Sequence, residues 1–328
     1  MDKDFWTGKR VLVTGADGFI GSHLTEKLLE YGAVVTIFVR GNSVTGTTQF
    51  ALRNTKSLEG KIKKIITGNI SARDSISLII REEPEYILHL AADAYVPNSF
   101  EHPIEVMETN LIGTLNILEA VMNLKDIVQC VCTSSSEIYG TAQYAPIDEE
   151  HPLNGTSPYA ASKIAADRYC FAYWNTYGIP VSIIRPFNTF GPRHTYDVIP
   201  KFINLALEGK ALTVYGTGEQ SRDFTYVSDM IRAFLIMGGN KKAIGKAINF
   251  GTGIDVSIND IAEKIVKYVA ELSNIKTEVV HIEKRLAEVQ RLICDYSKAK
   301  ELFGWEPKVS IDEGLKKNIE WEVNRRKK

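Results

Sequence analysis

Residues 10–30, RVLVTGADGFIGSHLTEKLLE, decide the fold of this chain. The short apolar run RVLVT at 10–14 ends at a glycine, a pattern typical of a buried parallel strand. Apolar side chains then recur at helical spacing over residues 19–31. The stretch predicts a strand, a tight turn and a helix, which together begin an alternating β/α fold.

Three glycines, Gly15, Gly18 and Gly21, occupy the junction between this strand and this helix. Glycine permits a tight turn and lets backbone N–H groups approach a pyrophosphate at the helix N-terminus. Because the glycines stand between a buried strand and an amphipathic helix, they predict a dinucleotide-binding site.

The same alternation continues through most of the chain. Further strands are predicted at residues 33–39, 86–92, 127–135, 181–187 and 246–253, each after helical sequence. This pattern indicates an α/β fold with a Rossmann-like, doubly wound parallel sheet.

After residue 187 the alternation loosens, and a short strand at 278–282 stands between two amphipathic helical stretches. We therefore expect two domains. The Rossmann domain comprises residues 1–187 plus 227–255, and a smaller mixed α/β lobe comprises residues 188–226 plus 256–328.

Charge and composition exclude several classes of partner. The 39 Lys and Arg residues against 40 Asp and Glu argue against a nucleic-acid or membrane-surface binder that depends on excess positive charge. The N-terminal sequence has no apolar signal-peptide core, and no apolar run approaches the ~20 residues of a membrane span, so a cytoplasmic protein is expected. Cys130, Cys132, Cys170 and Cys294 form no C-x-x-C pair and are predicted to be buried free thiols. The six histidines show no metal-ligand spacing, so no metal is expected.

The residues after the second predicted strand bear on the choice of dinucleotide. NAD-specific sites usually place Asp or Glu about 20 residues past the glycines to bind the adenosine ribose. Here the strand ends in FVRGNS, and no acidic residue lies between Glu30 and Glu59. Arg40, with Asn42 or Ser43, is instead suited to a 2′-phosphate, which favours NADP over NAD. The alternative is that Arg40 is an ordinary surface arginine.

Tyr159 and Lys163, in SPYAASKIAAD, lie one helical turn apart and therefore on one helix face. A lysine ammonium beside a phenol favours the phenolate and lowers the phenol pKa from about 10. Such a phenolate can take the proton of a substrate hydroxyl while hydride leaves the same carbon for a nicotinamide.

An ordered set of motifs resembles the extended short-chain dehydrogenase/reductase family of nucleotide-sugar epimerases and dehydratases. The motifs are TGADGFIG, HLAA, NLIGTLNILEA, TSSSEIYG, SPYAASK, RPFNTFGPR, VIPKFI, VYGTGEQSRDFTYVSD and FGWEP, from Gly15 to about Trp305. The resemblance implies that Tyr159 is the general base and that Lys163 holds both the phenolate and the nicotinamide ribose. It places Asn110 near the active site, with a buried structural amide as the alternative. Further cofactor contacts are expected from Phe19, Ile20, Asn69, Ile70, Leu90, Ala91 and Ala92.

The motif TSSSEIYG bears on the reaction. The resemblance implies that Ser135 bonds the oxygen of the sugar carbon that is oxidised. Ser136 and Glu137 resemble the Thr-Ser-Glu of GDP-mannose-type 4,6-dehydratases, and residues 133–164 are similar to GDP-N-acetylglucosamine 4,6-dehydratases. A carboxylate at Glu137 can remove the C5 proton, assist loss of the C6 hydroxyl as water, or do both.

A nucleotide-sugar 4,6-dehydratase is therefore the leading hypothesis. The alternatives are a 4-epimerase, a UDP-glucuronate decarboxylase and a non-catalytic dinucleotide-binding protein. The decarboxylases share Thr-Ser-Glu, but their tyrosine motif carries an arginine before the tyrosine and an acidic residue after it, and SPYAASKIAAD has neither.

The smaller lobe is expected to bind the nucleotide sugar. The resemblance assigns the substrate diphosphate to Arg193, Arg222 and Asn188, and the nucleotide ribose to Arg285 and Glu288; Val198, in VIPKFI, is a further expected substrate contact. The aromatic side chains Tyr169, Tyr173, Trp174 and Tyr177 follow Tyr159 on the same helix. In this family that helix usually joins a dimeric four-helix bundle, so a homodimer is expected.

Overall fold

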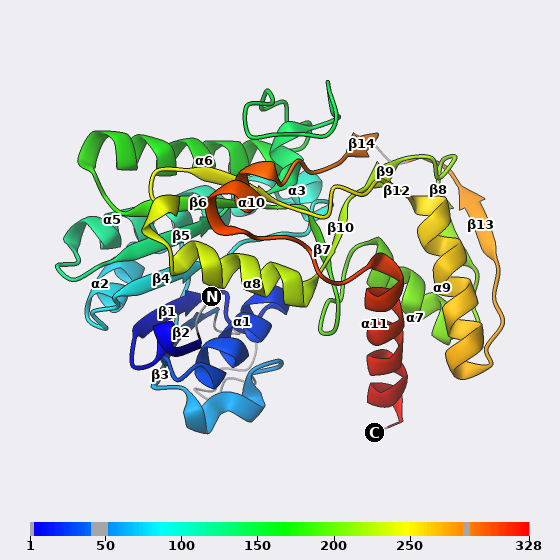
Figure 1. Cartoon of the computed structure of the whole chain (residues 1–328), viewed down its shortest axis with the longest axis horizontal. Coiled ribbons are helices and arrows are strands. Elements are labelled where there is room, and N and C mark those ends of the chain that lie inside the picture. Colours follow the sequence, from blue (N-terminus) through cyan, green and yellow to red (C-terminus); the bar gives the residue numbers. More distant parts are fainter. Residues whose placement is uncertain (1–2, 41–51, 285–288, 328) are drawn as a thin grey trace. The chain divides into compact units, whose positions relative to one another are not determined.

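The computed structural model describes residues 3–40, 52–284 and 289–327. Within these residues the largest sheet has seven strands in the order β11-β6-β5-β4-β1-β2-β3, and adjacent strands from β6 to β3 run parallel (Figure 1). The strands are β1 (Arg10–Thr14), β2 (Val34–Val39), β3 (Lys64–Thr67), β4 (Tyr86–His89), β5 (Gln129–Thr133), β6 (Val181–Pro186) and β11 (Ala247–Phe250). The predicted Rossmann-like α/β class is confirmed, although the sequence analysis missed the four-residue strand β3.

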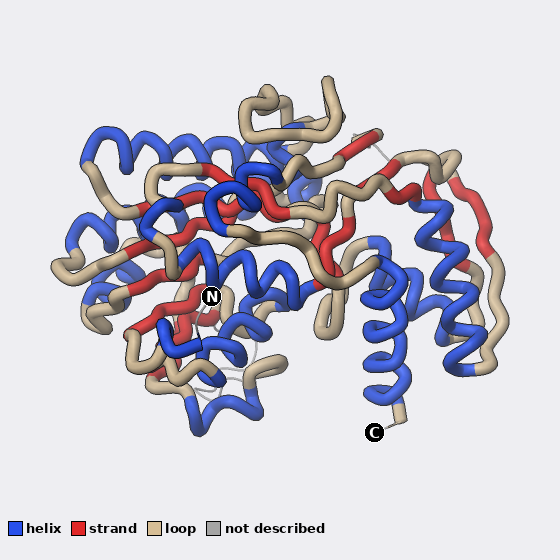
Figure 2. Tube along the Cα trace, in the orientation of Figure 1, coloured by secondary structure: helices blue, strands red, loops and turns tan. Residues whose placement is uncertain are grey.

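Helices cover both faces of this sheet. The α-helices are α1 (Phe19–Glu30), α2 (Asp74–Ile80), α3 (Asn98–Glu101), α4 (Pro103–Met107), α5 (Gly113–Asn123), α6 (Pro158–Tyr177) and α8 (Val227–Gly238). One core cluster joins Ile87 of β4 to apolar side chains of α2, α5 and α6. Leu88, the next residue along β4, points to the opposite face, toward Gly238 at the end of α8. Figure 2 shows the strands of this sheet between the helices.

Local sequence explains where the helix α6 begins and ends. Ser157 accepts a hydrogen bond from the Ala160 N–H, and Pro158 occupies the first helical position, where its missing N–H is harmless. The helix ends at Gly178, whose φ of 67° suits a residue without a β-carbon. The predicted site residues Tyr159 and Lys163 therefore lie in the first two turns of α6, close to a well-defined start.

An irregular helical segment lies between α4 and α5. The residues Glu108–Ile112 form a π-helix, and the Gly113 N–H donates to the Glu108 carbonyl, five residues back. π-helical segments are rare in proteins, and those that occur are often found at functional sites. The remaining short helices are η1 (Lys3–Trp6), η2 (Lys56–Lys61), η4 (Ser136–Tyr139) and η5 (Lys241–Ala243).

The described chain divides into two compact units. Unit 1 comprises Met1–Ile138, Ser157–Arg185 and Ile231–Ile248, and unit 2 comprises Tyr139–Thr156, Pro186–Met230 and Asn249–Lys328. These units differ from the predicted domain bounds chiefly at residues 139–156, which join unit 2 through contacts such as the hydrogen bond from the Tyr139 Oη to Asn249 Oδ1.

Unit 2 is a mixed α/β assembly of short elements. Its strands are β7 (Asn188–Phe190), β8 (Leu212–Tyr215), β9 (Ser221–Arg222), β10 (Phe224–Tyr226), β12 (Val256–Ser257), β13 (Val279–Ile282) and β14 (Arg291–Leu292), and its helices are α7 (Val198–Leu207), α9 (Ile258–Ser273), α10 (Ser297–Phe303) and α11 (Ile311–Arg326). A capping box between Ser257 and Asp260 begins α9. The two helices and one strand predicted for residues 256–328 correspond to α9, β13 and α11, whereas β12, β14 and α10 were not predicted. No helix or strand was predicted within residues 188–226.

The four cysteines, all of which are described, are buried free thiols, as predicted. No helix among the described residues is long and apolar enough to cross a membrane.

Candidate active site

The glycine-rich turn connects β1 to α1 and lies against the end of β4. Gly15 has a φ of 67°, and a β-carbon on it would lie 2.7 Å from the Ala91 backbone N. A β-carbon on Gly21 would lie 2.2 Å from the Gly15 carbonyl oxygen. Among the described residues, a β-carbon on Gly18 would contact only the Gly15 oxygen, at 3.1 Å. Two glycines thus permit close packing, and the third leaves space beside the turn that no described residue fills.

The first turn of α1 begins directly at this space. Gly18 precedes the helix, and no side chain in the described residues caps it through a hydrogen bond. The first N–H groups of a helix attract anions through their unpaired donors and the helix dipole. The turn therefore fits the pyrophosphate of a dinucleotide, as the spacing of the glycines predicts.

Asp17, within the turn, has a role that the sequence analysis missed. Its carboxylate accepts hydrogen bonds from the backbone N atoms of Arg53, Asn54 and Thr55 at 2.8–2.9 Å, and from the Thr55 hydroxyl at 2.8 Å. These contacts hold the backbone of residues 53–55 against the turn. They join positions 36–38 residues apart, so spacing along the chain gave no signal for them.

The residues expected around the adenosine are only partly described. Arg40, which follows β2, is exposed, and Asn42 and Ser43 lie outside the described residues. Asn69 is exposed and accepts bonds from the Ser71 N–H and hydroxyl. The other residues expected to contact the cofactor follow strands of the large sheet. Ile70 is buried after β3, Phe19 and Ile20 begin α1 after the glycine turn, and Leu90, Ala91 and Ala92 follow β4.

The serine-rich motif lies at the carboxyl end of β5. Ser135 and Ser136 are buried, Glu137 is half-buried, and the Glu137 N–H donates to Ser135 Oγ at 3.2 Å. Because Ser136 and Glu137 begin the short helix η4, the chain turns sharply there and presents consecutive polar side chains at the strand end.

Lys163 reaches the same strand end from α6. Its ammonium donates to the Thr133 carbonyl at 2.9 Å, and burial lowers its pKa from 10.5 to about 8. Tyr159, one turn earlier on the helix, is buried as well. The structure therefore brings Lys163 to the segment that begins at Thr133 and carries Ser135 and Glu137.

Asn110 lies in the π-helix and is fully buried. Its Oδ1 accepts from the Asp93 N–H at 2.8 Å, and its Nδ2 donates to the Asp93 carbonyl at 3.1 Å and to Ser162 Oγ at 3.0 Å. Ser162 in turn donates to the Tyr159 carbonyl at 2.7 Å. Asn110 thus joins the loop after β4 to the first turns of α6.

A buried ion pair anchors the middle of α6 to β6. The carboxylate of Asp167, one turn after Lys163, accepts from Arg185 Nε and Nη2, both at 2.9 Å, and from Arg168 Nη2 at 2.6 Å. Burial of Asp167 opposes ionisation, but the arginine bonds outweigh it and lower the carboxyl pKa.

The residues expected to bind the nucleotide sugar lie in unit 2, apart from Arg285 and Glu288, which lie outside the described residues. Asn188 begins β7, and its Oδ1 is a buried acceptor without a partner among the described residues. Val198 begins α7, and Arg193 occupies a loop with a φ of 72°. Arg222 is on β9, where its Nη1 donates to the Ser221 carbonyl at 2.9 Å.

Asp223, beside Arg222, was also missed by the sequence analysis. Its buried carboxylate accepts from the Thr252 N–H and hydroxyl and from the Gly253 N–H, each at 2.7 Å, and from the Cys294 N–H at 3.2 Å. Burial raises its pKa to about 6 despite these donors. Asp223 therefore ties the backbone beside Arg222 to two distant segments of unit 2.

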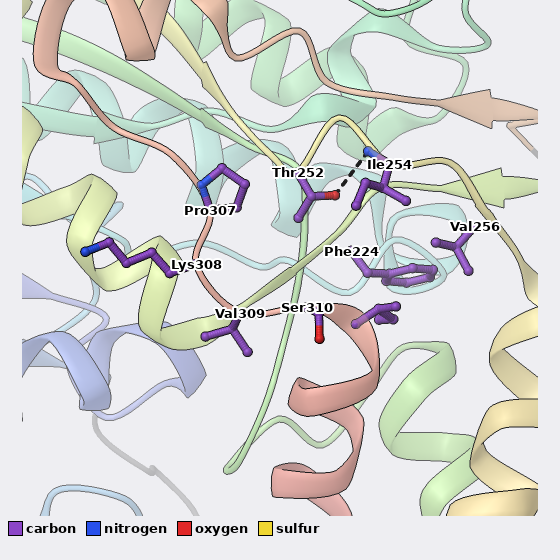
Figure 3. Close-up of a pocket in the computed structure, with 9 residues that line it drawn as sticks. Phe224, Thr252, Ile254, Val256, Pro307, Lys308, Val309 and Ser310 are labelled. Atoms are coloured by element: carbon purple, nitrogen blue, oxygen red, sulfur yellow. Dashed lines mark hydrogen bonds between the residues drawn. The ribbon is translucent and has the colours of Figure 1, made fainter.

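Unit 2 also contains a mostly apolar cavity of about 250 Å³. Figure 3 shows Phe224, Ile254 and Val256 around it, together with the segment that leads into α11. None of the predicted site residues that the structure describes lines this cavity.

Comparison with known proteins decides the family. The model of the GDP-mannose 4,6 dehydratase family matches residues 12–318, nearly the whole chain. The chain belongs to the extended short-chain dehydrogenase/reductase family. The resemblance drawn from the sequence motifs is thereby confirmed.

Relatives within this family carry different activities. A putative UDP-glucose 4-epimerase of Methanocaldococcus jannaschii is 35% identical over 96% of this chain and 98% of its own length. The UDP-glucuronic acid decarboxylase 1 of Danio rerio is 36% identical over 95% of this chain and 72% of its own. The structure of DesIV, a dTDP-glucose 4,6-dehydratase from Streptomyces venezuelae with NAD bound, is 28% identical, has a TM-score of 0.84 and covers 97% of this chain and 98% of its own.

This chain is accordingly an NAD(P)-dependent nucleotide-sugar enzyme of the extended short-chain dehydrogenase/reductase family, of the dehydratase or epimerase kind. Family membership supports the interpretation of the glycine turn as a dinucleotide site. Family membership does not distinguish between dehydration, epimerisation and decarboxylation as the reaction of this chain, because relatives of similar sequence identity carry each of these activities.

Proposed function

We propose that this chain is a nucleotide-sugar 4,6-dehydratase. The observation that carries the proposal is the pair Ser136–Glu137 at the end of β5, in the segment that begins at the Thr133 carbonyl bonded by Lys163. An epimerase needs no carboxylate here, because its hydride returns to the same sugar carbon from which it came.

The chemistry assigns one task to each residue. When bound, the nicotinamide dinucleotide accepts hydride from C4 of the sugar and later returns it to C6. The Lys163 ammonium stabilises the Tyr159 phenolate, which takes the proton of the C4 hydroxyl and becomes the neutral phenol. Ser135 bonds the C4 oxygen and keeps the carbonyl polarised.

Glu137 carries out the elimination. The C4 carbonyl acidifies the C5 hydrogen, so the Glu137 carboxylate removes that proton and then delivers it to the departing C6 hydroxyl, which leaves as water. Hydride returns to C6, and C5 takes a proton from solvent through Glu137. Tyr159 releases to solvent the proton that it took from the C4 hydroxyl, so the protons balance and one water is lost overall. The product is a 4-keto-6-deoxy nucleotide sugar.

Mass spectrometry after incubation with GDP- and UDP-linked sugars tests this reaction. Loss of one water from the substrate is the expected result. Loss of carbon dioxide would instead identify a decarboxylase, and an isomer of unchanged mass would identify an epimerase; either result overturns the proposal.

We also propose that the bound dinucleotide is NADP. Support comes from Arg40 after β2 and from the absence of an acidic residue between Glu30 and Glu59 in the sequence. Extraction of the dinucleotide from the purified protein tests this, and recovery of NAD alone would contradict it.

For the assembly we propose a homodimer formed through α5 and α6. On α6, Tyr169 and Tyr177 are exposed, whereas Tyr173 is half-buried and donates to Glu119 Oε1 of α5 at 2.6 Å. Met122 of α5 adds a further exposed apolar side chain to this surface. Exposed aromatic and sulfur-containing side chains of this kind are enriched at protein interfaces. Sedimentation of the wild type against a Tyr169→Glu/Tyr177→Glu variant tests the dimer, which is refuted if the wild type is a monomer.

A further inference from the structure

A continuous chain of buried hydrogen bonds runs from the glycine-rich turn to the π-helix. Thr14, the last residue of β1, lies opposite His89, the last residue of β4, and Thr14 Oγ1 is 2.7 Å from His89 Nδ1. On the other side of the imidazole, His89 Nε2 is 3.2 Å from Thr114 Oγ1 of α5. Thr114 then donates to the Asn110 carbonyl at 2.6 Å.

The contacts of Thr14 determine which imidazole nitrogen carries hydrogen. Thr14 Oγ1 accepts from the Ala91 N–H at 3.1 Å and from the Leu90 N–H at 3.2 Å, a donor shared with the Thr14 carbonyl. A hydroxyl has two acceptor positions and one hydrogen, so both positions are filled and the hydrogen is left for His89 Nδ1. His89 Nδ1 is therefore the acceptor.

The direction of the bonds between His89 and Asn110 follows from the direction of the bond between Thr14 and His89. A neutral imidazole that accepts at Nδ1 carries its hydrogen at Nε2, which donates to Thr114 Oγ1. Thr114 Oγ1 can then give its own hydrogen to the Asn110 carbonyl. Every donor in the series has one acceptor, and the direction runs from Thr14 through His89 to Asn110.

Burial keeps this arrangement in one protonation state. His89 is 2% exposed, and burial lowers its pKa from 6.5 to about 4, with Lys163 of α6 lowering it further and Cys132 of β5 opposing. The imidazole is consequently neutral at pH values well above 4, which include neutral pH. Thr14 and Thr114 are buried as well, so water does not compete for these bonds.

The two ends of the series contact different parts of the active site. At the Thr14 end, the Ala91 N–H is the group that Gly15 approaches so closely that a β-carbon would clash with it. At the Asn110 end, the side chain holds Asp93 and Ser162, and Ser162 holds the Tyr159 carbonyl.

We propose that His89 is a positioning residue that, as its Nε2–H tautomer, joins the dinucleotide-binding turn to Asn110 and so sets the start of α6 relative to that turn. The inference rests on the family's use of a dinucleotide and of Tyr159, and it holds whichever sugar reaction the enzyme performs. Its tests therefore read the imidazole and the dinucleotide directly, so that they succeed or fail independently of the 4,6-dehydratase assignment.

The first test reads the tautomer. ¹⁵N-histidine labelling of the whole protein, with the His89 signals identified by their absence from a His89→Phe or His89→Asn sample, gives the shifts of both ring nitrogens. We expect a protonated Nε2 and an unprotonated Nδ1 without change between pH 5.5 and 8. A hydrogen on Nδ1, or a ring that titrates within this range, overturns the proposal.

The second test reads whether the two ends are coupled. Thr114→Val removes the distal contact without touching the turn, and Ser182→Ala is the matched control, since its buried hydroxyl bonds Cys130 and Gln129 of β5. Hydrogen exchange of the Leu90 and Ala91 amides, and the Kd of NADP or NAD by titration calorimetry, are measured for both variants.

We expect Thr114→Val to speed exchange of the Ala91 amide and to weaken dinucleotide binding by about fivefold, the factor that corresponds to one lost hydrogen bond. Ser182→Ala should leave both within twofold. The proposal is overturned if Thr114→Val also leaves both unchanged, or if the two variants change them equally, because the effect would then be general loosening of unit 1.

Discussion

The buried ion pair between Asp167 and Arg185 gives a sharp prediction about the stability of the helix α6 in its place against β6. Asp167→Asn keeps the side-chain shape but removes the charge that faces Arg185, whose side chain is 3% exposed. Two hydrogen bonds of 2.9 Å join the pair in the wild type. The variant leaves the arginine charge buried without its counter-ion, which costs about 3–5 kcal/mol in unfolding free energy.

Arg168, the other arginine that bonds Asp167, provides a control variant for this prediction. Arg168 also bonds Asp167, but its side chain is 47% exposed, and solvent screens such a contact. Arg168→Gln is therefore expected to lose less than about 1 kcal/mol. The double variant Asp167→Asn/Arg185→Met should recover part of the loss, because no buried charge then lacks a partner.

Urea unfolding at pH 7, followed by tryptophan fluorescence, measures all of these variants. The pH dependence has a definite sign: the carboxyl pKa of Asp167 is lowered in the folded state, so its contribution is present above about pH 4, near the unfolded pKa of Asp, and is lost as the pH falls further. If Asp167→Asn is no less stable than Arg168→Gln, the pair does not hold α6 to β6 and this reasoning is refuted.

Three further predictions concern the site itself. Glu137→Gln should slow water elimination at least ~100-fold while hydride transfer to the dinucleotide is retained, as followed by mass spectrometry and nicotinamide absorbance; elimination at the wild-type rate would show that Glu137 is not the acid–base group. Gly21→Ala places a β-carbon 2.2 Å from the Gly15 oxygen and should abolish measurable dinucleotide binding in calorimetry, whereas an unchanged Kd would remove the turn from the site. Lys163→Met should be about 2 kcal/mol more stable than the wild type at pH 7, since lowering the lysine pKa from 10.5 to about 8 costs about 3 kcal/mol and the lost bond to Thr133 returns about 1. Between pH 8 and 10.5 the Lys163 amine is protonated in the unfolded state but not in the folded state, so the wild type should gain stability as the pH rises through this range. The variant should show no such gain. Parallel pH profiles of the two proteins in urea unfolding would contradict the burial of a charged Lys163.

Local sequence patterns were enough to predict the fold class and most of the residues of the candidate site. Strands such as 10–14 and 181–186 are recognisable because a buried parallel strand is a short continuous apolar run, and helices because their apolar spacing differs. The glycine turn and the spacing of Tyr159 and Lys163 are visible for the same reason, since each needs only residues within one element. The edge strand β3 escaped because four residues, half of them polar, form too short a pattern.

The tertiary structure decided how those elements are held together. The Asp17 contacts with residues 53–55, the pair of Asp167 and Arg185, and the contacts of His89 with Thr14 and Thr114 join groups that lie 18 to 75 residues apart. Neither periodicity nor local spacing records such contacts, because a buried polar group takes whichever partner the packed sheet and helices bring within about 3 Å. The sequence alone predicted the strand–turn–helix unit, which the structure confirms, and the candidate reactive residues, which stay a prediction. Their protonation and alignment depend on burial and on distant partners, which exist only once the chain is folded.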